Sequence, residues 1–392
     1  MESTSYTQER GENPRIAMVG MFGGMWKEYN PGCFWTGYKT YTEMQQRFPR
    51  SRIDAYSIDN KMQGAHMVRE NPYGFLPIRF FPRELQGDLL ERVLPRYDAV
   101  IIGGDIVWGG DDVVEDNPIF FAQSPSFLER KKPALLFNCV HTFYDDTHIH
   151  AMQETFRSAC ARASYISVRT DAIRCRLERL GIPQPIHHVP DIVLDCDLRP
   201  FRQIRPRPET SKPSLGISIR ARLADGLIRF LERSDLHDYE VSLFPFSRQY
   251  NNLETVKRVK AAFRERYRYV ETYGDPVESF LRVGDFDAVI TDTLHGITAA
   301  ILQQVPFISI DVEPEQTSRK DQQMEALGIG KERNIRLNGS DATGLERIAD
   351  KVHGLLKEPC VVDAERLLSV RQIIRTHFDA MESTIRAQCT ET

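Results

Sequence analysis

The chain has 392 residues, of which 41% are hydrophobic and 27% charged, and its formal net charge is −4. This composition is typical of a soluble globular protein, the length favours two domains, and acids and bases so evenly mixed give no sign of a nucleic-acid-binding protein. No run approaches the ~20 apolar residues that span a bilayer, and the polar N-terminus lacks the apolar core of a secretory signal. The seven cysteines are scattered without a C-x-x-C pair. We therefore expect a cytoplasmic protein with reduced thiols.

The first half of the chain alternates between apolar runs and helical segments after a disordered tail at residues 1–14. Such alternation predicts a parallel, doubly wound sheet. The predicted strands are 16–19, 53–57, 97–102, 134–138, 165–168 and a short one near 186–188, and the predicted helices are 40–48, 87–94, 155–163 and 171–180. Thr170 is expected to cap the last of these helices and Gly181 to end it. Residues 60–86 contain three prolines, which break any helix, and no element is predicted there.

A long loop rich in glycine and aromatic residues is expected between the first strand and the helix at 40–48. A loop of this length at the end of a strand is more often functional than idle. Its aromatic rings, Trp26, Trp35 and Tyr38, could stack on a sugar or pack the loop onto the domain.

The strand at 97–102 runs into two glycines, Gly103 and Gly104, and then Asp105. Glycine allows a close backbone approach at the end of a strand, and Asp105 is expected at the carboxyl tip, where open α/β sheets bind ligands. Asp105 could equally be an ordinary turn residue.

Several histidines and aspartates follow the strand at 134–138. His141, Asp145, Asp146, His148 and His150 could resemble metal ligands. Because no two of these histidines stand four residues apart and the set has no compact ligand spacing, we favour a solvated loop and expect no metal.

Residues 199–213 hold four prolines and many charges, and we expect them to link two domains, residues 15–198 and 214–340. A second alternating series follows the linker, so that each half is expected to be Rossmann-like. Its predicted strands are 215–219, 241–244, 269–271, 288–290 and 307–310, and its predicted helices are 221–233, a segment from Asn251 to 263, 276–283 and 296–304. Residues 341–392 should form two helices, 344–356 and 364–388, that pack back across the domain junction.

The segment from the strand at 288–290 to the strand at 307–310 carries the strongest functional signal. Thr291, Asp292, Thr293 and His295 crowd the loop at the carboxyl end of the first strand, ahead of a helix. Such a loop and the free N–H groups of the following helix suit an anionic ligand. The structural alternative is that Thr and Asp simply cap the helix.

These strand ends resemble those of the polysaccharide pyruvyl transferase family. The resemblance runs through IIGGD at 101–105, SVRTDAIRCRLERLGI at 167–182, VPDIVLD at 189–195, GISIR at 216–220 and TDTLHGITAAILQQVPFISI at 291–310. It implies two Rossmann-like α/β domains of glycosyltransferase-B-like architecture with the active cleft between them. It also implies transfer of a pyruvyl group from phosphoenolpyruvate to two hydroxyls of a sugar or glycan, with no other cofactor.

The donor's phosphate and carboxylate require fixed cations and N–H donors, and the chemistry requires an acid and a base. The resemblance and these requirements together assign His295 and Asp105 as catalytic residues. The expected donor-binding residues are Arg220, Thr293, Leu294, Gly296, Arg169 and Ser218. The expected acceptor or loop contacts are Gly103, Gly104, Trp26, Asn30, Trp108 and His141.

The sequence departs from the family at residue 293, where the usual Arg-Leu-His reads Thr293-Leu294-His295. Threonine cannot supply the missing bidentate cation. Another arginine could have taken the role, the candidates being Arg169, Arg222, Arg248 and Arg319, or the donor could differ. The alternatives are a nucleotide-sugar transferase of the same architecture and a catalytically silent protein that binds a glycan or an acidic metabolite. The helix at 296–304 has no Asp or Glu to hold a ribose, which disfavours the first of these.

Overall fold

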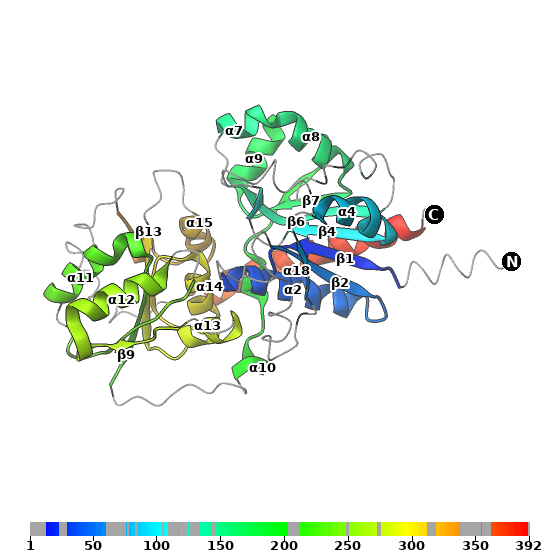
Figure 1. Ribbon diagram of the computed structural model, residues 1–392. Helices are drawn as coiled ribbons and strands as arrows, with labels where there is room; N and C mark the ends of the chain where they lie inside the picture. The colour runs from blue at the N-terminus through cyan, green and yellow to red at the C-terminus, as the bar shows by residue number, and fades with distance from the viewer. Residues whose placement is uncertain are drawn as a thin grey trace. The chain divides into compact units, whose positions relative to one another are not determined.

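The structure is a computed structural model, drawn as a ribbon in Figure 1. It describes residues 13–22, 30–59, 76, 78–82, 85–103, 106–108, 119, 122, 124, 127, 133–142, 146–202, 212–234, 236–247, 251–272, 276–311, 319–337, 354 and 362–390. The chain forms two compact units. The first comprises residues 1–26, 33–195 and 371–392, and the second comprises 27–32 and 196–370.

The first unit is a parallel sheet with helices. Seven strands lie in the order β3-β2-β1-β4-β6-β7-β8, and β5 pairs with β6. The strands are β1 (Ile16–Gly20), β2 (Ile53–Asp59), β3 (Ile78–Pro82), β4 (Ala99–Gly103), β5 (Ile106–Trp108), β6 (Ala134–Thr142), β7 (Tyr165–Val168) and β8 (Ile186–His188). The helices are most of α2 (Pro31–Arg47), α4 (Gln86–Asp88), α7 (Asp146–Ala151), α8 (Gln153–Arg162), α9 (Asp171–Arg179) and most of α18 (Ala364–Thr390). A π turn (Leu89–Val93) and two 3-10 turns (Leu94–Arg96 and Ile192–Asp195) complete it.

The second unit is also parallel throughout. Its six strands lie in the order β11-β10-β9-β12-β13-β14. They are β9 (Ser214–Ser218), β10 (Glu240–Leu243), β11 (Arg268–Tyr269), β12 (Ala288–Thr291), β13 (Phe307–Asp311) and β14 (Asn334–Arg336). The helices are α10 (Arg199–Arg202), α11 (Ala224–Arg233), α12 (Asn252–Phe263), α13 (Pro276–Val283), α14 (Leu294–Leu302) and α15 (Arg319–Ala326). Single 3-10 turns lie at Ala221–Leu223, Arg264–Arg266 and Lys331–Arg333.

The central strands are apolar because both faces of each sheet are covered. Every residue of β1, β4, β6, β9 and β13 is buried, as expected for parallel strands between two layers of helices. Each sheet has its own hydrophobic core, one reaching from Ala17 to Ile186 and the other from Leu215 to Leu337. The predicted class, two parallel α/β domains, is therefore confirmed. No helix among the described residues is both long and apolar enough to cross a membrane.

Helix α2 starts nine residues earlier than the predicted helix at 40–48, so much of the expected aromatic loop is helical. Pro31 occupies the first helical position, where its missing N–H costs nothing, and the Oδ1 of Asn30 accepts a hydrogen bond from the N–H of Gly32 at 3.0 Å. The ring of Trp35 is fully buried and packs edge-on against Phe34. Trp35 is thus a core residue.

Other differences follow from local chemistry. The segment expected as a solvated loop after residue 138 instead continues β6 to Thr142 and then forms α7, whose His148 and His150 are exposed. Part of the expected linker is helix α10, because Phe201 is buried and Arg202 pairs with Asp285 at 3.2 Å, both within the second unit. The helix expected at 344–356 lies outside the described residues apart from Gly354.

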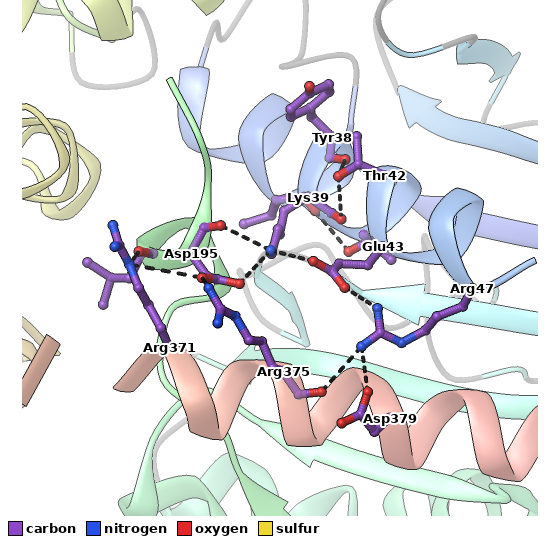
Figure 2. Close-up of polar contacts among 12 residues, drawn as sticks. Tyr38, Lys39, Thr42, Glu43, Arg47, Asp195, Arg371, Arg375 and Asp379 are labelled. Atoms are coloured by element: carbon purple, nitrogen blue, oxygen red, sulfur yellow. Dashed lines mark hydrogen bonds and ion pairs between the residues drawn. The ribbon is translucent and has the colours of Figure 1, made fainter. Parts of the chain in front are cut away.

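A charge network around a buried lysine attaches α18 to the rest of the first unit (Figure 2). The Nζ of Lys39 lies 2.6 Å from Glu43 and 2.7 Å from Asp195, and the side chains of all three are 10% exposed or less. Asp195 also accepts a hydrogen bond from Arg375 at 3.2 Å, and Arg47 reaches Asp379 at 2.7 Å. Helices α2 and α18 are therefore joined through ion pairs whose α18 members, Arg375 and Asp379, are exposed and whose partners, Asp195 and Arg47, are largely buried.

Candidate functional site

The strand order of the second unit defines where a ligand would bind. The first strand of that unit, β9, pairs on one side with the second, β10, and on the other with the fourth, β12. The chain therefore leaves β9 and β12 in opposite directions across the sheet, and this switch point is where open α/β sheets bind ligands. Ser218 is in register with Thr291. Arg220 and Thr293, each two residues further on, lie just past the switch point.

Arg220 forms an ion pair with Asp292. Its backbone N–H and its Nε donate to the Oδ2 of Asp292 at 3.1 and 2.5 Å, and its Nη2 donates to the Asp292 carbonyl at 3.0 Å. The Arg220 side chain is 13% exposed and that of Asp292 is 0% exposed. The cation predicted for the donor is thus present at the switch point as one half of an ion pair.

The loop from β12 leads directly into α14. Thr293 is the N-cap, since its Oγ1 accepts a hydrogen bond from the Gly296 N–H at 3.1 Å. The helix begins at Leu294, two residues before the predicted start, which places His295 in the first turn. No acidic residue lies within that turn, which carries the positive end of the helix dipole.

His295 is 7% exposed. The short segment 27–32 belongs to the same unit, and a Cβ added to Gly32 would collide with the His295 ring. Asn30, predicted as an acceptor contact, bonds to the Gly32 N–H and is 7% exposed. The structure therefore brings Asn30 close to His295. Ser218 is less available, because its Oγ accepts a hydrogen bond from the Phe246 N–H at 3.1 Å.

The first unit has a switch point of its own, between β1 and β4. Gly103 ends β4 there with a φ of 141°, and a Cβ at this position would overlap the backbone of Asn138. Glycine is therefore required at residue 103. Gly104, Asp105 and Trp26 lie outside the described residues.

Three other predicted residues are buried in the first unit. Trp108 is fully buried and packs edge-on against Phe137 and Phe156, as a core residue does. His141 is 6% exposed near the end of β6. Arg169 is 5% exposed and donates its backbone N–H to Val140 at 3.1 Å.

The Arg169 charge acts on Cys139. Burial raises the pKa of the Cys139 thiol to about 12, and the nearby Arg169 opposes that rise. Cys139 itself has a φ of 48°, at a register shift in the pairing of β6 with β7. Arg169 thus belongs to the first unit, whereas Arg220 belongs to the second.

None of the other candidate arginines is shown to replace the missing family arginine. Arg222 is exposed, Arg319 is half-buried, and Arg248 lies outside the described residues. In the part of the chain that the structure describes, no cluster of three or more His, Cys, Asp or Glu side chains could hold a metal ion.

Asp292 is the site residue that the sequence reasoning did not assign. It lies in the predicted loop, but its partner Arg220 stands 72 residues away along the chain, so no local pattern connects the two. One signal was available in the sequence: a basic residue, Arg220, follows one predicted strand and an acidic residue, Asp292, follows another. That signal identifies a pair only when β9 and β12 are known to be neighbours in the sheet.

These sheets and their switch points define a two-domain α/β protein of glycosyltransferase-B-like architecture. Similar folds include UDP-GlcNAc 2-epimerase from Neisseria meningitidis bound to UDP-GlcNAc, with TM-score 0.57 and 11% identity over 93% of this chain and 99% of that one. The UDP-GlcNAc 2-epimerase from Methanocaldococcus jannaschii is similar with TM-score 0.56 and 15% identity over 92% and 98% of the two chains. At these identities the likeness shows the fold alone.

Sequence gives the family. Residues 30–314 match the model of the polysaccharide pyruvyl transferase family, and the chain belongs to that family. Comparison with curated protein sequences found no match. Family membership supports a transferase that acts on glycans, and the resemblance expected from the strand ends is confirmed.

Proposed function

We propose that the protein transfers a pyruvyl group from phosphoenolpyruvate to two hydroxyls of a sugar or glycan, forming a cyclic ketal and releasing phosphate. The proposal is carried by one observation. A member of this family places a cation, Arg220, and a titratable imidazole, His295, just past two adjacent strands at the switch point of the second unit.

The reaction balances with these groups. An acid gives a proton to the methylene carbon of phosphoenolpyruvate, which becomes a methyl group, while a base takes the proton of the first acceptor hydroxyl as its oxygen bonds to the central carbon. The second hydroxyl then bonds to the same carbon as the carbon–oxygen bond to phosphate breaks, and the proton of that hydroxyl leaves with the phosphate. Imidazole can be the acid or the base near neutral pH.

Each residue has a separate part. Arg220 and the first turn of α14 provide positive charge and N–H donors for the donor's acidic groups. His295, in that same turn, is our candidate for proton transfer. Asp105 remains the second candidate, and Gly103 and Asn30 remain candidates for contact with the acceptor. The acceptor and the cytoplasmic location stay predictions.

The test is phosphate release from phosphoenolpyruvate in the presence of a panel of sugar acceptors. His295→Ala should lower kcat about 10²- to 10⁴-fold, because a general acid or base contributes that much. Arg220→Ala should raise the donor KM roughly 10- to 100-fold, since a charged hydrogen bond contributes about 1.5–3 kcal/mol.

The matched controls are His237→Ala and Arg233→Ala, two exposed residues of the same unit. They should leave kcat and KM unchanged. Full activity of His295→Ala, or release of a nucleoside diphosphate from a nucleotide sugar instead of phosphate from phosphoenolpyruvate, would contradict the proposal.

A further inference from the structure

Asp292 holds both the backbone and the side chain of Arg220. Its Oδ2 accepts from the Arg220 N–H and Nε, and its carbonyl accepts from Nη2. Two nitrogens of the planar guanidinium are therefore bound to two oxygens of a single residue. This fixes the plane and direction of the guanidinium, which a single contact would leave free to rotate.

The carboxylate of Asp292 is only half satisfied. Its Oδ1 is buried, and no donor within the described residues reaches it. A buried carboxylate oxygen without a donor is costly, and natural proteins seldom keep one without a reason. A purely structural role would favour a residue that satisfies both oxygens, so stability alone does not explain an aspartate here.

The position of Asp292 points to function as well. It lies between β12 and the N-cap Thr293, and through Arg220 it contacts the segment that follows β9. It thus joins the two strands that flank the switch point, where the donor is proposed to bind. A change in Asp292 would move Arg220 relative to the first turn of α14.

We propose that Asp292 is a positioning residue for the donor: it sets the orientation in which Arg220 meets the acidic groups of phosphoenolpyruvate. This inference rests on the proposed function. It assigns Asp292 no contact with the reacting atoms, because Arg220 occupies its Oδ2 and its side chain is 0% exposed.

The test compares donor and acceptor kinetics in five proteins: the wild type, Asp292→Asn, Asp292→Ala, Arg220→Ala and the double variant that combines Asp292→Ala with Arg220→Ala. Asp292→Asn retains an oxygen for Nε but loses the charge, and we expect its donor KM to rise about 10-fold. Asp292→Ala should approach the donor KM of Arg220→Ala. The acceptor KM should stay within about twofold in all variants, because a positioning effect on Arg220 concerns the donor alone.

The double variant gives the decisive comparison. If Asp292 acts through Arg220, the double variant has the same donor KM as Arg220→Ala, so the two effects do not add. Effects that multiply, or an acceptor KM that rises with the donor KM, would overturn the proposal. Circular dichroism and thermal unfolding of Asp292→Asn check that the fold is retained, and this milder variant serves if Asp292→Ala does not fold.

A direct binding measurement separates this inference from the proposed function. If the wild type releases no phosphate with any acceptor, the proposed function fails, and the role of Asp292 is then tested by calorimetric titration with phosphoenolpyruvate and with inorganic phosphate. Binding by the wild type that weakens about 10-fold in Asp292→Asn supports the positioning role. Equal binding by both proteins, or none by the wild type, refutes it.

Discussion

The buried histidine of α18 makes the stability of the first unit depend on pH. The Nδ1 of His377 lies 2.9 Å from the Tyr165 hydroxyl, and its Nε2 lies 2.8 Å from the Oδ1 of Asn138. Burial, with smaller effects of His187 and Arg47, lowers the pKa of His377 from 6.5 to about 3. The imidazole is therefore neutral in the folded protein at all pH values above that range.

The direction of the pH effect on stability follows from the number of protons that the folded and unfolded chains bind at residue 377. Below pH 6.5 the unfolded chain binds a proton at residue 377 and the folded chain does not, so the free energy of unfolding falls as pH drops from 6.5 towards 3. The loss is about 1.4 kcal/mol for each pH unit, or roughly 2 kcal/mol at about pH 5. In His377→Gln this contribution is absent, although the variant is less stable at about pH 8 because it loses buried hydrogen bonds.

Tryptophan fluorescence isolates the relevant unit, because Trp26, Trp35 and Trp108 are the three tryptophans of the chain and all belong to the first unit. Denaturant unfolding is followed at about pH 8 and about pH 5 for the wild type, His377→Gln and the exposed control His150→Gln. The wild type and the control should lose roughly 2 kcal/mol more than His377→Gln between the two pH values. Equal losses in all three proteins would refute the reasoning.

Two further predictions concern residue 293 and the charge network around Asp195. Thr293→Arg should lower the donor KM about 10-fold, because it restores the cation of the family motif. Thr293→Ala loses the same N-cap without adding charge and should not lower the donor KM. An unchanged donor KM in Thr293→Arg would show that the donor does not reach this residue. Asp195→Asn should lower the free energy of unfolding seen by tryptophan fluorescence by about 3 kcal/mol, because it leaves the buried Lys39 ammonium with less compensation. Glu154→Gln, a change at an exposed pair with Arg157 in the same unit, should cost under about 0.5 kcal/mol. Equal effects of these two substitutions would mean that the buried network contributes little.

The strands that could be predicted best are short apolar runs that end in a polar loop before a helix. The strands around Arg220 and His295 could be predicted because short apolar runs bounded by helices have few other solutions in an α/β protein. Helix α2 was harder: its glycines and aromatic residues suggested a loop, and the deciding features were Pro31 and the Asn30 side chain at its start. Local propensity there is overridden by the packing of Trp35.

The pairing of Arg220 with Asp292 could not be read from local patterns. It depends on β9 lying beside the fourth strand of its sheet, a fact of topology that spacing along the chain does not encode. The same holds for the Lys39 and Asp195 pair, which are 156 residues apart. Polar contacts between residues so far apart in the chain can be predicted only when the order of the strands and helices in the fold is known.

The division of the first unit along the chain determines the order in which the protein can be built during translation. That unit takes its last part from residues 371–392, whereas nearly all of the second unit is continuous from 196 to 370. The second unit can therefore close before residues 371–392 emerge from the ribosome, and the first unit, although synthesised earlier, completes its packing around His377 only once those residues have emerged. A premature stop codon near residue 370 would thus damage the domain at the opposite end of the gene.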